Sequence, residues 1–198
     1  MSDLGDRLPL PVRNDRALER LRVRRSAPAQ ALTAPGPDAQ QLDILLELAA
    51  RTPDHGKLFP WRFLIIEGPA KARLIEALRP LADAQPEPAK AASVLAKLAN
   101  PPVTVLVISC PIPGHKVPVW EQELSAGAVC MNLEHAADAM GFSTSWITDW
   151  YAYDARALPL LGLADGEKVA GFIHIGTLLE GPAERPRPNM NAIVSRLP

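Results

Sequence analysis

Three adjacent residues near the N-terminus, Arg24, Arg25 and Ser26, have side chains that suit a phosphate group. Each guanidinium can donate paired hydrogen bonds to phosphate oxygens, and a serine hydroxyl can complete the cradle. The cluster follows a segment with helical spacing, and the dipole at a helix C-terminus also favours exposed cations. The cluster is therefore either an anion site or a solvated helix end. For these residues taken alone, the solvated end is the simpler interpretation.

A second concentration of charge occupies residues 51–61, between an apolar helical pattern and an apolar extended run. Pro53 disfavours helix at the residue before it, so Arg51 is expected at the end of its helix. His55 then falls on a loop, where binding residues are disproportionately found. An ordinary helix-to-strand turn would account for the segment equally well.

The histidine, serine and tryptophan candidates elsewhere give weaker signals. The histidines lack metal-ligand spacing, and no Gly-rich nucleotide fingerprint is present. A hydrolase would need Ser125 or Ser143 to meet a histidine by chance. His174 alternates within an apolar strand and is expected to be a hydrogen-bonded core residue. Trp146 and Trp150 could flank a planar ligand, although closing the edge of the core is the favoured role.

The composition is that of a globular protein without a strongly charged face. The chain has 198 residues, a formal net charge of -1 and 47% hydrophobic residues. This length can form one domain, with 1–13 and 181–198 as extended arms. Near-neutral charge argues against nucleic-acid binding, and we find neither a signal peptide nor a membrane-length apolar run. We therefore expect a cytoplasmic protein with Cys110 and Cys130 as buried, reduced thiols, and with neither nucleic acid nor membrane as a partner.

The spacing of apolar residues predicts helices and strands in an irregular order. Helices are expected at 14–23, 38–51, 70–78, 89–98, 118–140 and 154–161, and strands at 62–67, 103–109, 142–148 and 169–177. Because no regular strand–helix–strand rhythm is present, the pattern favours an α+β fold over a doubly wound sheet.

The longest predicted helix, 118–140, carries no charge between Glu123 and Glu134. A helix that is apolar on every side is normally buried on every side. Small residues around Gly127 would let another backbone approach closely. The helix is therefore expected at the centre of the protein, packed either within one chain or against a second subunit.

Several separated segments, taken together, resemble the flavin-dependent nitroreductases. The main ones are Arg24-Arg25-Ser26, Arg51-x-Pro-Asp-His55 followed by Pro60-Trp61, and Trp120-Glu-Gln-Glu-Leu-Ser-Ala-Gly127. Gly141-Phe142 and Gly171-Phe-Ile-His-Ile-Gly-Thr177 continue the pattern in order. The chain looks most like small NAD(P)H nitroreductases with Arg-Arg-Ser and Pro-Asp-His signatures, over about residues 18–177.

The resemblance implies a mixed sheet flanked by helices, with the long central helix at a homodimer interface and FMN held between subunits. The implied FMN contacts come from three segments: Arg24, Arg25 and Ser26 at the phosphate and ribityl chain; Arg51 and His55 from the other side of the interface; and Trp146, Ile147 and Thr148 along the flavin.

Two parts of this implied site stay open. Close relatives tend to have Arg where this chain has Ile147, and the change removes a cation from near the ligand. A tail residue, Arg185 or Arg187, could supply a further cation to the phosphate.

The implied activity is that of an enzyme in which the flavin carries the redox chemistry and the protein supplies binding and orientation. No side chain is expected to act catalytically. NADH or NADPH would reduce the flavin, and a small electron-poor acceptor such as a nitroaromatic or a quinone would reoxidise it in a ping-pong cycle. The alternative is an FMN-binding protein with little turnover, a carrier, sensor or scavenger, which the Ile147 departure favours.

Overall fold

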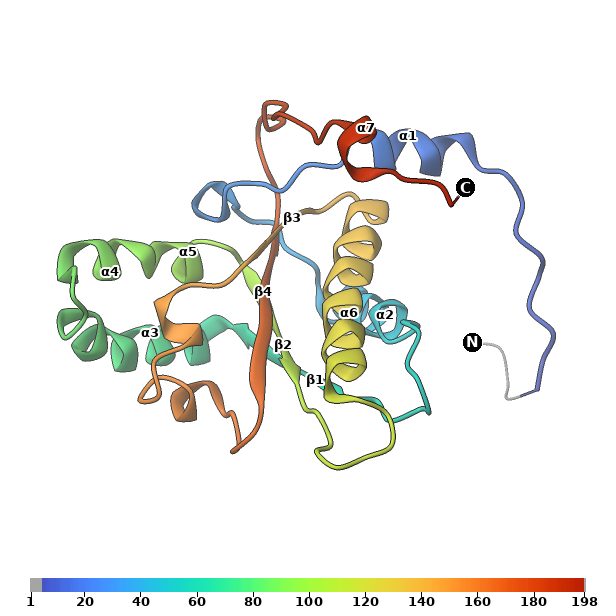
Figure 1. The fold of residues 1–198 in the computed structure, drawn as a ribbon. Helices are drawn as coiled ribbons and strands as arrows, with labels where there is room; N and C mark the ends of the chain where they lie inside the picture. The colour runs from blue at the N-terminus through green and yellow to red at the C-terminus, as the bar shows by residue number, and fades with distance from the viewer. Residues whose placement is uncertain (1–4, 198) are drawn as a thin grey trace.

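A four-stranded sheet lies at the centre of residues 5–197, the part of the chain that the computed structural model describes (Figure 1). Its strands are β1 (Trp61–Glu67), β2 (Val103–Ser109), β3 (Ser143–Ile147) and β4 (Lys168–Gly176), in the order β1-β2-β4-β3. All three pairings are antiparallel. The predicted α+β fold is confirmed. The sheet was expected to be mixed, but in the described residues it is antiparallel throughout. Strands β1 and β2 pair in opposite directions even though helices α3, α4 and α5 separate them in the chain.

Helices cover both faces of the sheet. They are α1 (Asp15–Val23), α2 (Ala39–Ala49), α3 (Gly68–Asp83), α4 (Pro88–Val94), α5 (Ala96–Ala99), α6 (Val119–Ala139) and α7 (Met190–Ile193), with 3-10 turns at Ala29–Ala31, Trp150–Ala152 and Pro159–Leu161. Helices α2 and α6 pack on one face and α3 to α5 on the other (Figure 1). Within the described residues, no helix is long and apolar enough to cross a membrane.

Strand β2 supplies both layers of the core. All seven of its residues are buried. Leu106 and Ile108 contact the cluster under α3 to α5, whereas Val105 and Val107 contact the cluster under α2 and α6. Side chains alternate between the faces of a strand, so a continuous β-branched run suits a strand buried on both sides. The strand predicted at 103–109 is confirmed.

Local signals define the ends of the helices near the candidate site. The Asn14 side chain accepts a hydrogen bond from the Ala17 amide at the start of α1. Asp38 and Gln41 form a capping box at the start of α2. Gly141, with a φ of +86°, follows the end of α6 in the left-handed conformation that glycine adopts readily.

The prediction of a helix at 154–161 is wrong. These residues form turns that end in the short 3-10 segment Pro159–Leu161. The Asp154 carboxylate accepts a 2.8 Å hydrogen bond from the Arg156 amide, which favours a local turn.

Three other segments differ from their predicted extents. The helix expected at 70–78 extends over the whole of α3, through Pro80. The helix expected at 89–98 is divided into α4 and α5 at Leu95. The tail, expected to be extended, contains the short helix α7.

Helix α6 is buried on its inner sides but open along one stripe. Val129 and Leu133 are buried in the core, whereas Trp120 is 67% exposed and Leu124 is 52% exposed. Ala128, one turn further on, is also exposed. The prediction of burial on every side therefore fails for one chain alone.

The two cysteines are free thiols, as expected. Cys130 is buried in α6 and Cys110 is half-buried. Burial raises the pKa of both, to about 12 for Cys130 and about 11 for Cys110, so neither is an activated thiolate.

Candidate functional site

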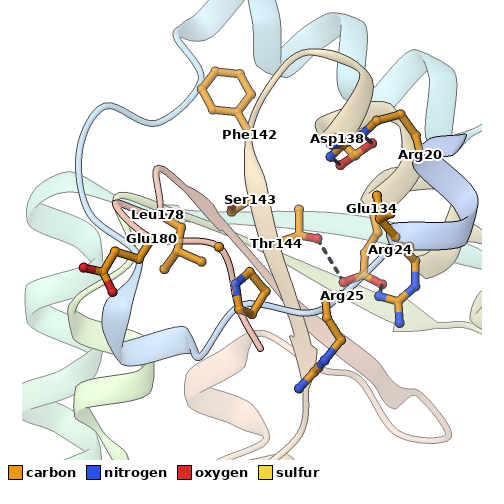
Figure 2. Close-up of a pocket in the computed structure, with 13 residues that line it drawn as sticks. Arg20, Arg24, Arg25, Glu134, Asp138, Phe142, Ser143, Thr144, Leu178 and Glu180 are labelled. Carbon is orange, nitrogen blue, oxygen red and sulfur yellow. Dashed lines mark hydrogen bonds and ion pairs between the residues drawn. The ribbon is translucent and has the colours of Figure 1, made fainter. Parts of the chain in front are cut away.

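The residues that follow α1 contribute to two neighbouring hollows. The first, which we call the paired-charge hollow, has a volume of about 320 Å³ and lies between α1, the C-terminal half of α6, β3 and residues 178–182 (Figure 2). Arg20 donates a 3.0 Å hydrogen bond from Nε to Asp138. Arg24 lies with Nη1 3.9 Å from the Glu134 carboxylate. Both arginines therefore face carboxylates of α6.

Glu134 is buried and sets the electrostatics of this hollow. Its carboxylate accepts a 3.0 Å hydrogen bond from the Thr144 hydroxyl of β3. Burial raises its pKa, while the Thr144 hydroxyl and the Arg24 guanidinium act in the opposite direction. Figure 2 shows Arg24 reaching toward Glu134 while Arg25 points away from the pair. The positive charge of Arg24 is thus partly balanced by the Glu134 carboxylate of the same chain.

The second hollow, which we call the cationic cavity, has a volume of about 390 Å³. Its walls include Arg25, Ser26, Lys97, Trp146, Ile147 and Arg185. The three cations come from the loop after α1, from α5 and from the C-terminal tail. No carboxylate is among the described residues that line it. An anion in this cavity would therefore meet cationic side chains from three segments, of which Lys97 is already paired with Asp149.

One backbone and one side-chain hydrogen bond hold the wall of the cationic cavity in place. The Ala27 amide donates a 2.8 Å hydrogen bond to the Thr144 carbonyl, which ties the loop to β3. Arg25 Nε donates a 3.0 Å hydrogen bond to the Ala183 carbonyl, which ties the same loop to the tail. Loop, strand and tail therefore meet at one place, although they lie far apart in the sequence.

Trp146 closes the edge of the core, as favoured from the sequence, and also lines the cavity. Its indole Nε1 donates a 3.2 Å hydrogen bond to the Ala170 carbonyl of β4. A Cβ at Gly171 would come within 2.1 Å of that same nitrogen, so only glycine leaves room for the indole. Trp150 is likewise anchored, through a 3.1 Å hydrogen bond to the Ala91 carbonyl.

Lys97 is the cavity residue that the sequence did not indicate. Its Nζ lies 2.9 Å from Asp149 Oδ2, just beyond β3. The pair joins two segments 52 residues apart, and Lys97 lies in a four-residue helix without any motif. By contrast Thr148, which was implied as a contact, bonds to the Tyr153 hydroxyl at 2.9 Å and does not line the cavity.

The structure separates the two tail arginines. Arg185 lines the cationic cavity. Arg187 donates a 3.2 Å hydrogen bond to the Arg24 carbonyl and pairs with Glu184 at 2.8 Å. Arg185 is therefore the tail residue placed to meet an anion in the cavity.

His55 lies apart from the cationic cavity, near the first turn of α6. Arg51 follows the end of α2 and is not among the described residues that line the cavity. His55 lines a third, open hollow of about 490 Å³, the histidine hollow, together with Asp54, Glu121, Leu124 and Ser125. Glu121 and Glu134 are 13 residues apart on α6, about 20 Å along the helix axis. One chain alone does not bring the implied FMN contacts together.

The loop that carries His55 is anchored to α6 and to itself. Ser125 Oγ donates a 2.9 Å hydrogen bond to the Pro53 carbonyl and accepts one of 3.2 Å from Trp61 Nε1. The Asp54 carboxylate accepts a 2.7 Å hydrogen bond from the Phe59 amide. Asp54 thus has a structural role. The Ser125 hydroxyl hydrogen-bonds to Trp61 and Pro53 and to no histidine, which argues against a hydrolase that uses Ser125.

His174 is a core residue, as expected, but only one of its ring nitrogens is paired. Nδ1 lies 2.8 Å from the Thr104 hydroxyl, whereas Nε2 has no partner among the described residues. Burial lowers its pKa to about 3, so the ring is neutral. No group of three or more potential metal ligands occurs within residues 5–197.

Comparison with known proteins identifies the family. The model of the nitroreductase family matches residues 21–177. The chain belongs to the nitroreductase family. It is 36% identical over 163 residues to a protein of Escherichia coli (strain K12) provisionally named NAD(P)H nitroreductase YdjA, a match that covers 81% of this chain and 87% of that one.

Solved structures agree with this nitroreductase fold. A nitroreductase-like family protein from Bacillus cereus matches with a TM-score of 0.81 at 20% identity, covering 96% of this chain and 99% of that one. A provisionally assigned nitroreductase from Desulfovibrio desulfuricans, solved in complex with FMN, matches with a TM-score of 0.70 at 20% identity, covering 94% and 99%.

In this nitroreductase the implied site residues therefore fall into two separate groups. Arg25, Ser26, Trp146 and Ile147 meet in the cationic cavity. His55 lies at the other end of α6, Arg51 is among the lining residues of neither hollow, and Arg24 faces Glu134.

Proposed function

We propose that this nitroreductase is an FMN-dependent oxidoreductase. NADH or NADPH supplies the electrons, and small electron-poor acceptors such as nitroaromatics and quinones receive them in a ping-pong cycle. The observation that carries the proposal is the cationic cavity, which has three cations and no carboxylate among the described residues that line it. The FMN in the related structure and the name of the Escherichia coli relative support the choice of cofactor and reductant.

The residues of the cationic cavity suit the phosphate end of FMN. Arg25 and Arg185 can donate charge-assisted hydrogen bonds to phosphate oxygens, and the Ser26 hydroxyl can add another. Trp146 and Ile147 add a wall with an apolar surface and exposed strand backbone. When bound, FMN supplies the two-electron chemistry, while these residues hold and orient it.

A second copy of the chain would complete the site. Trp120, Leu124 and Ala128 form an uncovered stripe on α6, and no residue of α1 is buried. Apolar surface of this kind on a helix favours association with another surface. We infer a homodimer in which His55 and Arg51 of one subunit approach the cationic cavity of the other.

The absorption spectrum of the purified protein tests the proposed function. Flavin bands should be present or should appear when FMN is added. They should bleach on anaerobic addition of NADH or NADPH, then return when a nitroaromatic or quinone is added. A colourless protein that takes up no FMN would overturn the proposal.

Substitution at Gly127 tests the dimer. A Cβ at Gly127 has no neighbour within 4 Å in the single chain, so the subunit itself can accommodate a larger residue there. Gly127→Leu should therefore leave the subunit folded but weaken the dimer and its FMN content, whereas Gly127→Ala should have a much smaller effect. Light scattering and flavin content measure both. An intact, FMN-loaded Gly127→Leu dimer would contradict an interface on α6.

An FMN-binding protein with little turnover is the alternative function. The uncharged Ile147 in the cavity wall favours it, because no guanidinium from that position stabilises a reduced, anionic flavin. It predicts tight FMN binding without bleaching by either nicotinamide cofactor.

A further inference from the structure

The shortest side-chain contact of the histidine hollow joins His55 and Glu121. Nδ1 of His55 lies 2.6 Å from Glu121 Oε2. His55 is on the loop between α2 and β1, and Glu121 is in the first turn of α6. His55 Nε2 makes no hydrogen bond to the part of the chain that the structure describes. The imidazole is thus held at one nitrogen and free at the other.

Stabilisation of the fold is a poor explanation for this pair. The side chains are 65% and 42% exposed, and exposed ion pairs contribute little to the free energy of unfolding. The loop backbone is already fixed by the hydrogen bonds of Ser125 and Asp54. The contact with Glu121 additionally fixes the orientation of the His55 ring.

A carboxylate partner fixes both the tautomer and the direction of an imidazole. An ionised carboxylate only accepts hydrogen bonds, so Nδ1 must carry the proton that faces Glu121. The same arrangement orients histidines in metal sites and in catalytic triads. In the neutral ring, Nε2 then carries a lone pair and can accept a hydrogen bond. In the charged ring, Nε2 carries a proton and can donate one.

The histidine hollow lies beside the surface that a second copy would cover. His55 and Leu124 line the same hollow, and Leu124 belongs to the uncovered stripe of α6. Association through that stripe would bring the hollow against the other subunit. A polar group of a ligand held by that subunit could then meet Nε2 in one defined hydrogen-bonding form.

We propose that Glu121 is a positioning residue for the cofactor. It holds the His55 imidazole with Nδ1–H toward its own carboxylate, so that Nε2 is presented to the flavin bound by the other subunit. Glu121 itself does not touch the flavin. This inference rests on the proposed FMN-dependent dimer.

The tautomer of His55 tests the first step without any cofactor. In isotope-labelled protein at alkaline pH, the ring nitrogens of His55 should show the Nδ1–H form. Glu121→Ala should shift the ring toward the Nε2–H form, and Glu121→Gln should retain Nδ1–H because the amide oxygen still accepts. The same tautomer in wild type and in Glu121→Ala would overturn the proposal.

FMN affinity, followed by flavin fluorescence, tests the second step. Glu121→Ala should raise the dissociation constant of FMN about threefold to tenfold, the value of one ordinary hydrogen bond, and Glu121→Gln should raise it less. The double variant His55→Ala, Glu121→Ala should bind no more weakly than His55→Ala alone. Glu123→Ala is the matched control, because Glu123 is on the same helix turn but pairs with Lys168 at 2.6 Å. It should bind FMN as wild type does.

Failure of this inference differs from failure of the proposed function. A wild-type protein that binds no FMN would overturn both. A wild-type protein that binds FMN, with Glu121→Ala unchanged or with additive losses in the double variant, would overturn only the role of Glu121. A loss in Glu123→Ala equal to that in Glu121→Ala would do the same.

Discussion

The paired-charge hollow and the cationic cavity lie side by side, share Arg25, and differ in what faces their cations. In the hollow, Asp138 and Glu134 of α6 meet Arg20 and Arg24. In the cavity, Arg25 and Arg185 face no carboxylate among the described residues of the lining. Two adjacent arginines of one motif can therefore have different roles, one binding within the chain and the other available to a ligand.

The difference arises from the direction of each side chain. Arg24 and Arg25 follow each other in an extended segment, where successive side chains point to opposite sides. Arg24 therefore turns to α6 and Arg25 to the tail and β3, as their partners Glu134 and Ala183 indicate. Arg25 forms no ion pair with a carboxylate of the described residues, although Glu184 of the tail lies near enough to interact with its charge, so Arg25 is a better candidate for a phosphate contact than Arg24.

Arg25→Ala should have the largest effect on the cofactor. Losing charge-assisted hydrogen bonds to phosphate should weaken FMN binding by about 1.5–3 kcal/mol, with little change in the free energy of unfolding. Isothermal titration and thermal denaturation of the apoprotein measure the two quantities. Arg20→Ala, whose arginine is already paired with Asp138, is the control and should leave the FMN affinity unchanged. Equal losses of affinity in both variants would remove the distinction between the two hollows.

Arg24→Ala should affect stability more than FMN binding. The variant leaves the buried Glu134 without its nearby cation, which should cost about 1–2 kcal/mol of the free energy of unfolding. Its effect on FMN affinity should be smaller than that of Arg25→Ala. Urea denaturation and FMN titration of the same preparations compare them. If Arg24→Ala lost more FMN affinity than Arg25→Ala, the assignment of the two arginines would be reversed.

Glu134→Gln should flatten the pH dependence of stability. Burial raises the pKa of Glu134 in the folded protein above its ordinary value near 4.5. Its contribution to stability is therefore complete below that ordinary value and is lost as the pH rises through the higher folded pKa. Glutamine keeps an acceptor for the Thr144 hydroxyl but does not titrate. Urea midpoints measured upward from mildly acidic pH should fall in wild type relative to the variant, and parallel curves would contradict the burial of the charge.

The fold was largely predictable because its signals are local. The β-branched run of β2, the capping box at Asp38 and the glycine after α6 each act within a few residues. The open stripe of α6 was not predictable, because small residues such as Ala128 suit a buried and an exposed position equally. Residues 154–161 form turns instead of the predicted helix, because the Asp154 carboxylate accepts a hydrogen bond from the Arg156 amide.

The candidate site was predictable only where a motif marks it. Arg25, Ser26 and Trp146 were found because they belong to motifs. Lys97 was not, since its role depends on Asp149, 52 residues away. Nor could the sequence reveal that Arg24 faces Glu134, because that contact depends on how α1 and α6 pack.

The two tail arginines should show the smallest difference, and it tests how far the cationic cavity extends. Arg185 lines the cavity, whereas Arg187 binds the Arg24 carbonyl and Glu184. Exposed charge pairs contribute up to about 1 kcal/mol, so Arg185→Ala should raise the FMN dissociation constant by at most about fivefold, and Arg187→Ala should change it less. FMN titrations at low and high salt would distinguish the two variants. Salt screens the charge of Arg185, so the loss of FMN affinity in Arg185→Ala should be smaller at high salt, whereas the effect of Arg187→Ala should not depend on salt. A larger loss in Arg187→Ala would mean that the tail rearranges when the cofactor binds, and the cavity would then be completed by a different cation.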